Sequence, residues 1–163
     1  YEGIDKSNDA AMAKADSSVV GVAMLGLDMR YNKGGAQFKG QLYYTSLSNT
    51  EEYNHFTAES GQPNDLGSEM FGYYLEAGYD LLHSNVSTES QLIPFIRYSN
   101  YDTQHGMEKG FTTNKDYAKT AITTGISYKI TSGSVVKADM QFIKSKADND
   151  FSKQLNLGVG FWF

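Results

Sequence analysis

The 163-residue sequence predicts an all-β fold, a transmembrane antiparallel up-and-down β-barrel. Three observations lead to this prediction. Apolar and polar residues alternate with a period of two in seven successive runs. These runs are about ten to fourteen residues long, whereas strands of soluble proteins usually have five or six, and about ten tilted residues cross a bilayer. The face opposite the apolar one carries charges, Gln and Thr, so it points to water rather than to a packed core.

Composition is in keeping with long strands. The chain has 16 glycines, 12 tyrosines and 9 phenylalanines but only 2 prolines, a balance that favours strands. It has no cysteine, which excludes thiolate metal sites, iron–sulfur clusters, disulfides and cysteine nucleophiles. A formal net charge of -5 disfavours a general nucleic-acid binder, because phosphate contacts need a basic face. No apolar run approaches the roughly 18 residues of a transmembrane helix.

Each run is bounded by turn chemistry. A glycine-containing turn follows the first run and suits a hairpin. Pro94 lies inside the fourth run, where a proline usually marks an edge strand or a bulge. The fifth and sixth runs are separated by a four-residue turn, and the seventh alternates up to Phe163. The predicted strands cover residues 19–31, 36–46, 70–82, 91–100, 117–130, 135–142 and 155–163.

A soluble β-sandwich is the alternative fold, because its strands also alternate. Sandwich strands are shorter, however, and their polar faces rarely keep this many ions over such a length. The membrane barrel is therefore the favoured prediction, with residues 18–163 supplying seven transmembrane strands of a single barrel segment, residues 1–163.

Loop lengths predict the orientation of the strands. Short connections follow the first, third and fifth runs, and the long ones, 47–69 and 101–116, follow the second and fourth. Outer-membrane barrels have short periplasmic turns and long extracellular loops, so the last strand ends in the periplasm. Its aromatic end, with Phe161 and Phe163, resembles the C-terminal signal that the outer-membrane assembly machinery reads.

Residues 1–17 show no strand pattern and are predicted as an extracellular loop or short helix. Seven strands are an odd number, whereas bacterial barrels have an even number and must close, since an open edge in lipid leaves backbone groups unsatisfied. We therefore expect the chain to be the C-terminal part of a larger barrel. The alternative is an eight-strand barrel whose first strand is hidden in residues 1–17.

Several stretches resemble the bacterial porins related to the phosphate-selective porins O and P. They cover most of residues 19–163 in order: GLDMRY at 26–31, GSEMFGYYLEAGYD at 67–80, LIPFIRY at 92–98, YDTQ at 101–104, VVKADMQF at 135–142 and LNLGVGF at 155–161. In that family such stretches fall in the C-terminal half of a barrel of about sixteen strands.

The resemblance implies passive diffusion of small solutes, often anions, across the outer membrane of a Gram-negative bacterium. Members of the family often form a homotrimer. The phosphate-binding members use ladders of arginine and lysine, built largely from upstream regions. The arginines of this chain are Arg30 and Arg97 alone.

The charges on the polar face are the candidate pore wall. Six are positive and four negative, so a slightly basic wall would favour small anions weakly; a neutral, paired wall that merely holds water is the alternative. The predicted lumen-lining residues are Asp28, Arg30, Lys39, Glu76, Asp80, Arg97, Lys119, Lys129, Lys137 and Asp139.

Glu76 and Arg97 are the strongest candidate pair on this wall. They lie equally far from the middle of the turn 83–90, so a symmetric hairpin places them opposite each other. A carboxylate–guanidinium pair across two strands would stiffen the wall.

No enzyme, cofactor or metal is predicted. The three histidines have no ligand spacing, no catalytic triad is marked, and the acidic stretch 148–150 lacks the further ligands of a calcium loop. The expected function is an outer-membrane porin, passing small hydrophilic solutes or ions with a mild preference for anions. Its partners would be outer-membrane lipid, the solutes and the assembly machinery. The alternative is a plugged or structural barrel whose extracellular loops bind a partner.

Overall fold

The computed structural model describes residues 7–162, in which seven antiparallel strands form one open sheet. Neighbours in the sequence are neighbours in the sheet, in the order β1 to β7. The predicted all-β, antiparallel, up-and-down arrangement is therefore confirmed. The strands are β1 Gly21–Lys33, β2 Ala36–Ser48, β3 Glu69–Tyr79, β4 Gln91–Gly106, β5 Ala118–Thr131, β6 Ser134–Ser145 and β7 Ser152–Phe161; the helices are α1 Asp9–Ser17, α2 Thr50–Phe56 and the 3₁₀ helix η1 Lys115–Tyr117.

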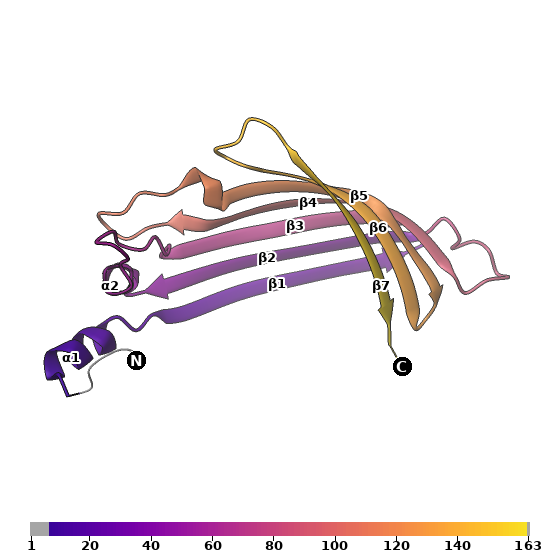
Figure 1. The fold of residues 1–163 in the computed structure, drawn as a ribbon. Coiled ribbons are helices and arrows are strands. Elements are labelled where there is room, and N and C mark those ends of the chain that lie inside the picture. Colours follow the sequence, from indigo (N-terminus) through magenta and orange to yellow (C-terminus); the bar gives the residue numbers. More distant parts are fainter. Residues whose placement is uncertain (1–6, 163) are drawn as a thin grey trace.

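The sheet is a curved wall with two different ends (Figure 1). Helices α1 and α2 lie at the end that we call the loop end. The connections after β1, β3 and β5 lie at the opposite end, which we call the turn end. The two-residue turns 34–35 and 132–133 share one end, as the loop-length pattern predicts, but the connection 80–90 at that end has eleven residues, as many as 107–117 at the loop end. The loop end holds the connections 49–68, 107–117 and 146–151, and the turn end holds 34–35, 80–90 and 132–133.

The two faces of the sheet differ in chemistry and in curvature. Apolar side chains of one face stand open, with Leu27 64% and Leu157 77% exposed. The polar face is the concave one, because a single hollow on it is lined by residues of β1 through β6. Within residues 7–162, the buried apolar side chains are confined to Ala15, Ile93, Phe95, Ala118 and Ala121. The described chain is therefore a single-layered wall without a packed core.

Strand β4 differs most from its predicted bounds. It continues to Gly106, whereas the sequence predicted its end at residue 100. Pro94 lies inside this central strand and not at an edge, and the ladder to β5 runs through it without a shift. The amide hydrogen that proline lacks would point toward β3, since Leu92, two residues earlier, bonds on that side. On that side Pro94 lies between the pair Gly78 and Phe95 and the bond from the N–H of Leu81 to the carbonyl oxygen of Leu92 at 2.8 Å, so the proline leaves one gap at the end of this ladder.

Strand β3 ends at Tyr79, before its predicted end at residue 82, because Asp80 turns the chain. The buried Asp80 carboxylate accepts hydrogen bonds from the backbone N–H groups of Leu82, at 3.0 Å, and Leu92, at 3.1 Å. Its own N–H donates to the carbonyl oxygen of Gly35 at 2.8 Å. Asp80 therefore joins the first two turns of the turn end.

Helix α1 occupies most of the N-terminal segment that the structure describes. The Asn8 side chain caps it by accepting hydrogen bonds from the N–H groups of Ala10 and Ala11, as an N-cap asparagine commonly does. The helix falls in the segment for which the sequence left a loop or a short helix open. The alternative of a strand hidden in residues 1–17 is wrong for Asp9–Ser17, which are helical, and residues 1–6 lie outside the described residues.

Two connections at the loop end are held together by buried amide side chains. Asn54 of α2 is 1% exposed and binds both the N–H and the carbonyl oxygen of Leu66. Gln104 of β4 is 2% exposed; its amide nitrogen donates to the carbonyl oxygen of Asp65, and its amide oxygen accepts from the N–H of Asn114 at 2.7 Å. Gln104 thus joins the connections 49–68 and 107–117.

Replacing Gln104 with leucine is expected to loosen both connections locally. Two backbone groups lose their partners, so the free energy of local opening should fall by about 2 kcal/mol. Amide hydrogen exchange at Asn114 and its neighbours measures this change. Gln62→Leu is the matched control, because Gln62 is exposed in the same connection. Unchanged exchange in Gln104→Leu would show that other contacts hold the loop end together.

Candidate functional site

The registers of the seven strands bring the predicted charges of four strands into one row across the concave face. Arg30 of β1 pairs with Lys39 of β2, Lys39 with Glu76 of β3, and Glu76 with Arg97 of β4. The row continues through Thr123, Gln141 and Gln154 on β5 to β7. We call these seven residues the central row.

Glu76 is the electrostatic centre of the central row. One carboxylate oxygen lies 2.8 Å from Nζ of Lys39, and the other accepts hydrogen bonds from Arg97, at 2.9 Å from its Nε. The predicted pair of Glu76 and Arg97 is therefore confirmed, and Lys39 joins it as a second cation. The guanidinium also lies over the ring of Tyr74, 4.6 Å from its centroid, a favourable cation–π geometry.

The central row borders a hollow of about 350 Å³ on the concave face, which we call the cationic recess. Its cationic members, contributed by five strands, are Arg30, Lys39, Arg97, Lys129 and Lys137, against the single carboxylate of Glu76. Lys129 makes no ion pair with any residue from 7 to 162. The recess can therefore attract a small anion by the field of several cations on one concave wall.

The remaining predicted charges lie around this recess or away from it. Asp28 pairs with Arg30 at 3.2 Å on the exposed strand β1. Asp139 pairs with Lys137 at 3.3 Å and accepts a hydrogen bond from Asn156 at 2.9 Å.

Two predicted wall residues take other positions. Lys119 lies on the concave face near the loop end, opposite Tyr101 and Ser145. The buried Asp80 carboxylate serves the turns described above, so its contacts are those of a turn cap. Phe161 ends β7 and is exposed, and Phe163 lies outside the described residues.

The sequence reasoning missed two apolar members of the recess. Ile93 and Phe95 share the concave face with Arg97, and both are buried there. Nζ of Lys137 lies over the Phe95 ring, 4.4 Å from its centroid. The sequence indicates them, because Ile93 and Phe95 are apolar at positions of the strand that would otherwise be polar.

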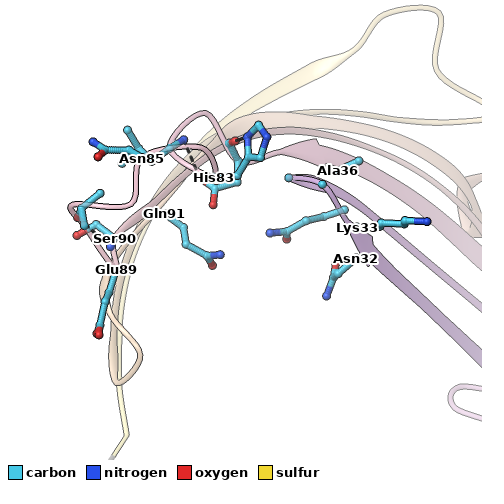
Figure 2. A pocket seen from close by; sticks show the side chains of 14 residues that line it. Asn32, Lys33, Ala36, His83, Asn85, Glu89, Ser90 and Gln91 are labelled. Atoms are coloured by element: carbon cyan, nitrogen blue, oxygen red, sulfur yellow. Dashed lines mark hydrogen bonds between the residues drawn. The ribbon is translucent and has the colours of Figure 1, made fainter.

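A second hollow, of about 360 Å³, lies at the turn end and is shown in Figure 2; we call it the turn recess. Asn32 and Gln37, which face each other across β1 and β2, line both recesses. The turn recess adds the side chain of Gln91 from β4. The two hollows are therefore neighbours that share a wall of two amides. Cations predominate in the cationic recess, whereas the turn recess combines amides with charges of both signs.

His83 is one of the residues that line the turn recess. Its Nδ1 lies 3.0 Å from the carbonyl oxygen of Asp80, and its Nε2 lies 2.9 Å from the Ser84 hydroxyl. The ring also covers Gly35, where an added Cβ would come within 2.7 Å of it. Gly35 and Gly34 both have positive φ, 80° and 57°, as a type I′ hairpin turn requires.

Within residues 7–162, no three His, Asp or Glu side chains come together in a way that could hold a metal ion. The acidic stretch 148–150 forms no such cluster either. Asp148 accepts hydrogen bonds from the N–H of Ser145, at 3.1 Å, and from its hydroxyl, at 2.8 Å. These bonds lower the pKa of the Asp148 carboxyl below its usual value and make it a local cap of its loop.

No helix in the described part of the chain has the length and apolar character needed to cross a membrane.

Comparison with known proteins gives one informative similarity. The chain is 32% identical over 113 residues to an uncharacterized protein of Aquifex aeolicus (strain VF5). The match covers 66% of this chain but only 26% of that protein, so this chain corresponds to about a quarter of its length. No family model matches the chain, and no solved structure matches it at a significant level.

Proposed function

We propose that this chain is part of a transmembrane β-barrel of the bacterial outer membrane that works as a porin. Small hydrophilic solutes or ions would diffuse passively through its lumen, with a mild preference for anions. The observation that carries the proposal is the opposition of the two faces: an open apolar convex face and a concave face with a hollow ringed by cations. The apolar face suits lipid and the charged face suits a water-filled lumen.

The sheet edges support a larger barrel. Among the described residues, neither the outer edge of β1 nor that of β7 has a partner strand. In lipid, the backbone groups of these edges need hydrogen-bond partners, which a closed barrel supplies. The greater length of the Aquifex relative is compatible with further strands, as is the resemblance to porins of about sixteen strands.

The mild anion preference rests on the balance of charge in the cationic recess. Five cations line it together with one carboxylate, that of Glu76. Two of the five, Arg30 and Lys137, also pair with Asp28 and Asp139. Cations on a narrow concave wall raise the local concentration of anions, and added salt weakens this effect. No side chain is asked to do chemistry, so the proposed function needs no catalytic residue or cofactor.

Single-channel recording tests the porin proposal. The full-length protein, in a planar bilayer with a potassium chloride gradient, is expected to open in steps. The reversal potential should lie on the anion side. A reversal potential on the cation side would contradict the role assigned to the cationic recess while leaving a porin. Absence of steps from correctly folded protein would contradict the porin itself.

A plugged barrel that binds a partner through its loops is the second candidate function. The observation that favours it is the order of the loop end, where Gln104 and Asn54 fix two long connections through buried hydrogen bonds. A preformed surface loses less conformational entropy when a partner binds. A folded protein that conducts no current would favour this function over the porin.

A further inference from the structure

We propose that the cationic recess and the turn recess together form a subsite for small hydroxylated carboxylates. Such solutes join one anionic group to several hydroxyls. The inference rests on the proposed porin function and names a solute class for it. It is carried by the contact between two hollows of different chemistry, which Asn32 and Gln37 line on both sides.

The anionic end of the solute would lie in the cationic recess. Lys129 has no carboxylate partner within residues 7–162, and Lys39 and Arg97 share the one carboxylate of Glu76. Arg97 and Lys39 side chains remain 33% and 38% exposed, so both can reach a solute while they hold Glu76. A carboxylate is a good partner for such groups, because charge-assisted hydrogen bonds are the strong ones.

The hydroxyl-bearing end would lie against the amides of the turn recess. A side-chain amide both donates and accepts hydrogen bonds, which suits a hydroxyl group. The amides of Asn32, Gln37 and Gln91 make no side-chain hydrogen bond within residues 7–162, so their hydrogen-bonding groups are available. Figure 2 shows the Asn32 and Gln91 side chains reaching from different strands toward one open space.

A glycine lies beside the wall that the two recesses share. On β3, the neighbour of Gln37 in the register is Gly78, which lines the cationic recess. A Cβ at this position would lie 3.0 Å from Ile93 Cγ2 and 3.2 Å from the carbonyl oxygen of Pro94. Gly78 therefore allows close strand packing and also leaves the Gln37 amide without a side chain on its β3 side.

The spacing and charge of the two ends define the solute further. Lys39 and Gln37 are two residues apart on one strand face, a rise of about 7 Å, which a six-carbon hydroxy acid can span. The turn recess holds Lys33 and Glu89 together, so it offers no excess of positive charge for a second carboxylate. Inorganic phosphate would bind the cations but leave the amides without hydrogen-bond partners. A neutral sugar would bind the amides but leave the cations without a counter-charge.

The experiment measures binding of gluconate, acetate and inorganic phosphate to the full-length protein. Two readouts are used: reduction of the single-channel current and calorimetry in detergent. Gluconate is expected to bind more tightly than acetate, which has the same charge and no hydroxyls. Gln37→Leu should weaken gluconate binding about three- to tenfold, the equivalent of one hydrogen bond, and leave acetate and phosphate binding unchanged.

Gln41→Leu is the matched control, because Gln41 lies on the same face of β2 as Gln37, on the far side of Lys39, and lines neither recess. Equal binding of acetate and gluconate, or gluconate binding that Gln37→Leu does not change, would overturn the subsite. Calorimetric binding that depends on Gln37 in a protein that passes no current would support the subsite and overturn the porin. A protein that conducts current but binds gluconate independently of Gln37 would support the porin and overturn the subsite.

Discussion

Replacing Glu76 with glutamine is expected to raise the anion-to-cation permeability ratio of the proposed pore about sevenfold. The substitution removes the one carboxylate of the cationic recess and leaves Lys39 and Arg97 in place. A unit charge about 7 Å from a passing ion changes its energy by about 0.6 kcal/mol in water. The change has opposite signs for an anion and a cation, so the ratio shifts by about 1.2 kcal/mol, which corresponds to this factor. Reversal potentials measured in dilute salt, where screening is weak, provide the test.

Glu59→Gln is the control for this variant, because it removes the same charge from the exposed connection at the loop end. It should move the reversal potential much less than Glu76→Gln does. Equal shifts would mean that overall charge, and not the recess, sets selectivity. Stability should fall by only about 1 kcal/mol in Glu76→Gln, because the Lys39 and Arg97 side chains are a third or more exposed to water.

Gly125→Ala is expected to destabilise the folded protein by about 2 to 3 kcal/mol. An added Cβ would lie 2.3 Å from the carbonyl oxygen of Ala138 and 2.5 Å from Cβ of Asp139, which faces Gly125 in the register of β5 and β6. The first contact is with backbone, so a rotamer change cannot relieve it. Asp139 is also held by Lys137 and Asn156, and both contacts would be strained.

Urea unfolding of the two proteins measures this loss, with the slope checked for a change in denatured-state compactness. Gly158→Ala on β7 is the matched control, because a Cβ there meets no atom within 4 Å. It should leave the unfolding midpoint close to that of the unchanged protein. A Gly125→Ala protein as stable as Gly158→Ala would show that the two strands can separate without cost.

The sequence predicts the strands and their faces better than it predicts the side-chain contacts between strands. Period-two alternation defines the strands and their faces because each strand has one apolar face. The pair of Glu76 and Arg97 follows from sequence because the two residues lie equally far from the middle of their connection, and the hairpin is symmetric there. Lys39 could not be assigned to Glu76 in the same way, since β2 and β3 are joined by the long connection 49–68, whose length does not define a register.

Other features depended on local competition that a pattern does not reveal. The alternation along β3 places Asp80 on the polar face. In the structure, however, its carboxylate is occupied by hydrogen bonds from backbone N–H groups next to the end of β3. Strand β4 runs past its predicted end because polar residues with no alternation still pair with β3 and β5. The recesses depend on sheet curvature, which brings Lys137 of β6 over Phe95 of β4 and is not written in any one strand.

The Gln104 junction has a consequence for how other molecules would recognise the loop end. Because one buried side chain fixes the carbonyl group of Asp65 and the N–H group of Asn114 together, the surface there is assembled from two distant stretches of chain. An antibody or other binder raised against the folded protein would read a discontinuous epitope. Linear peptides copied from either stretch would compete poorly for such a binder, since neither carries the partner that shapes it.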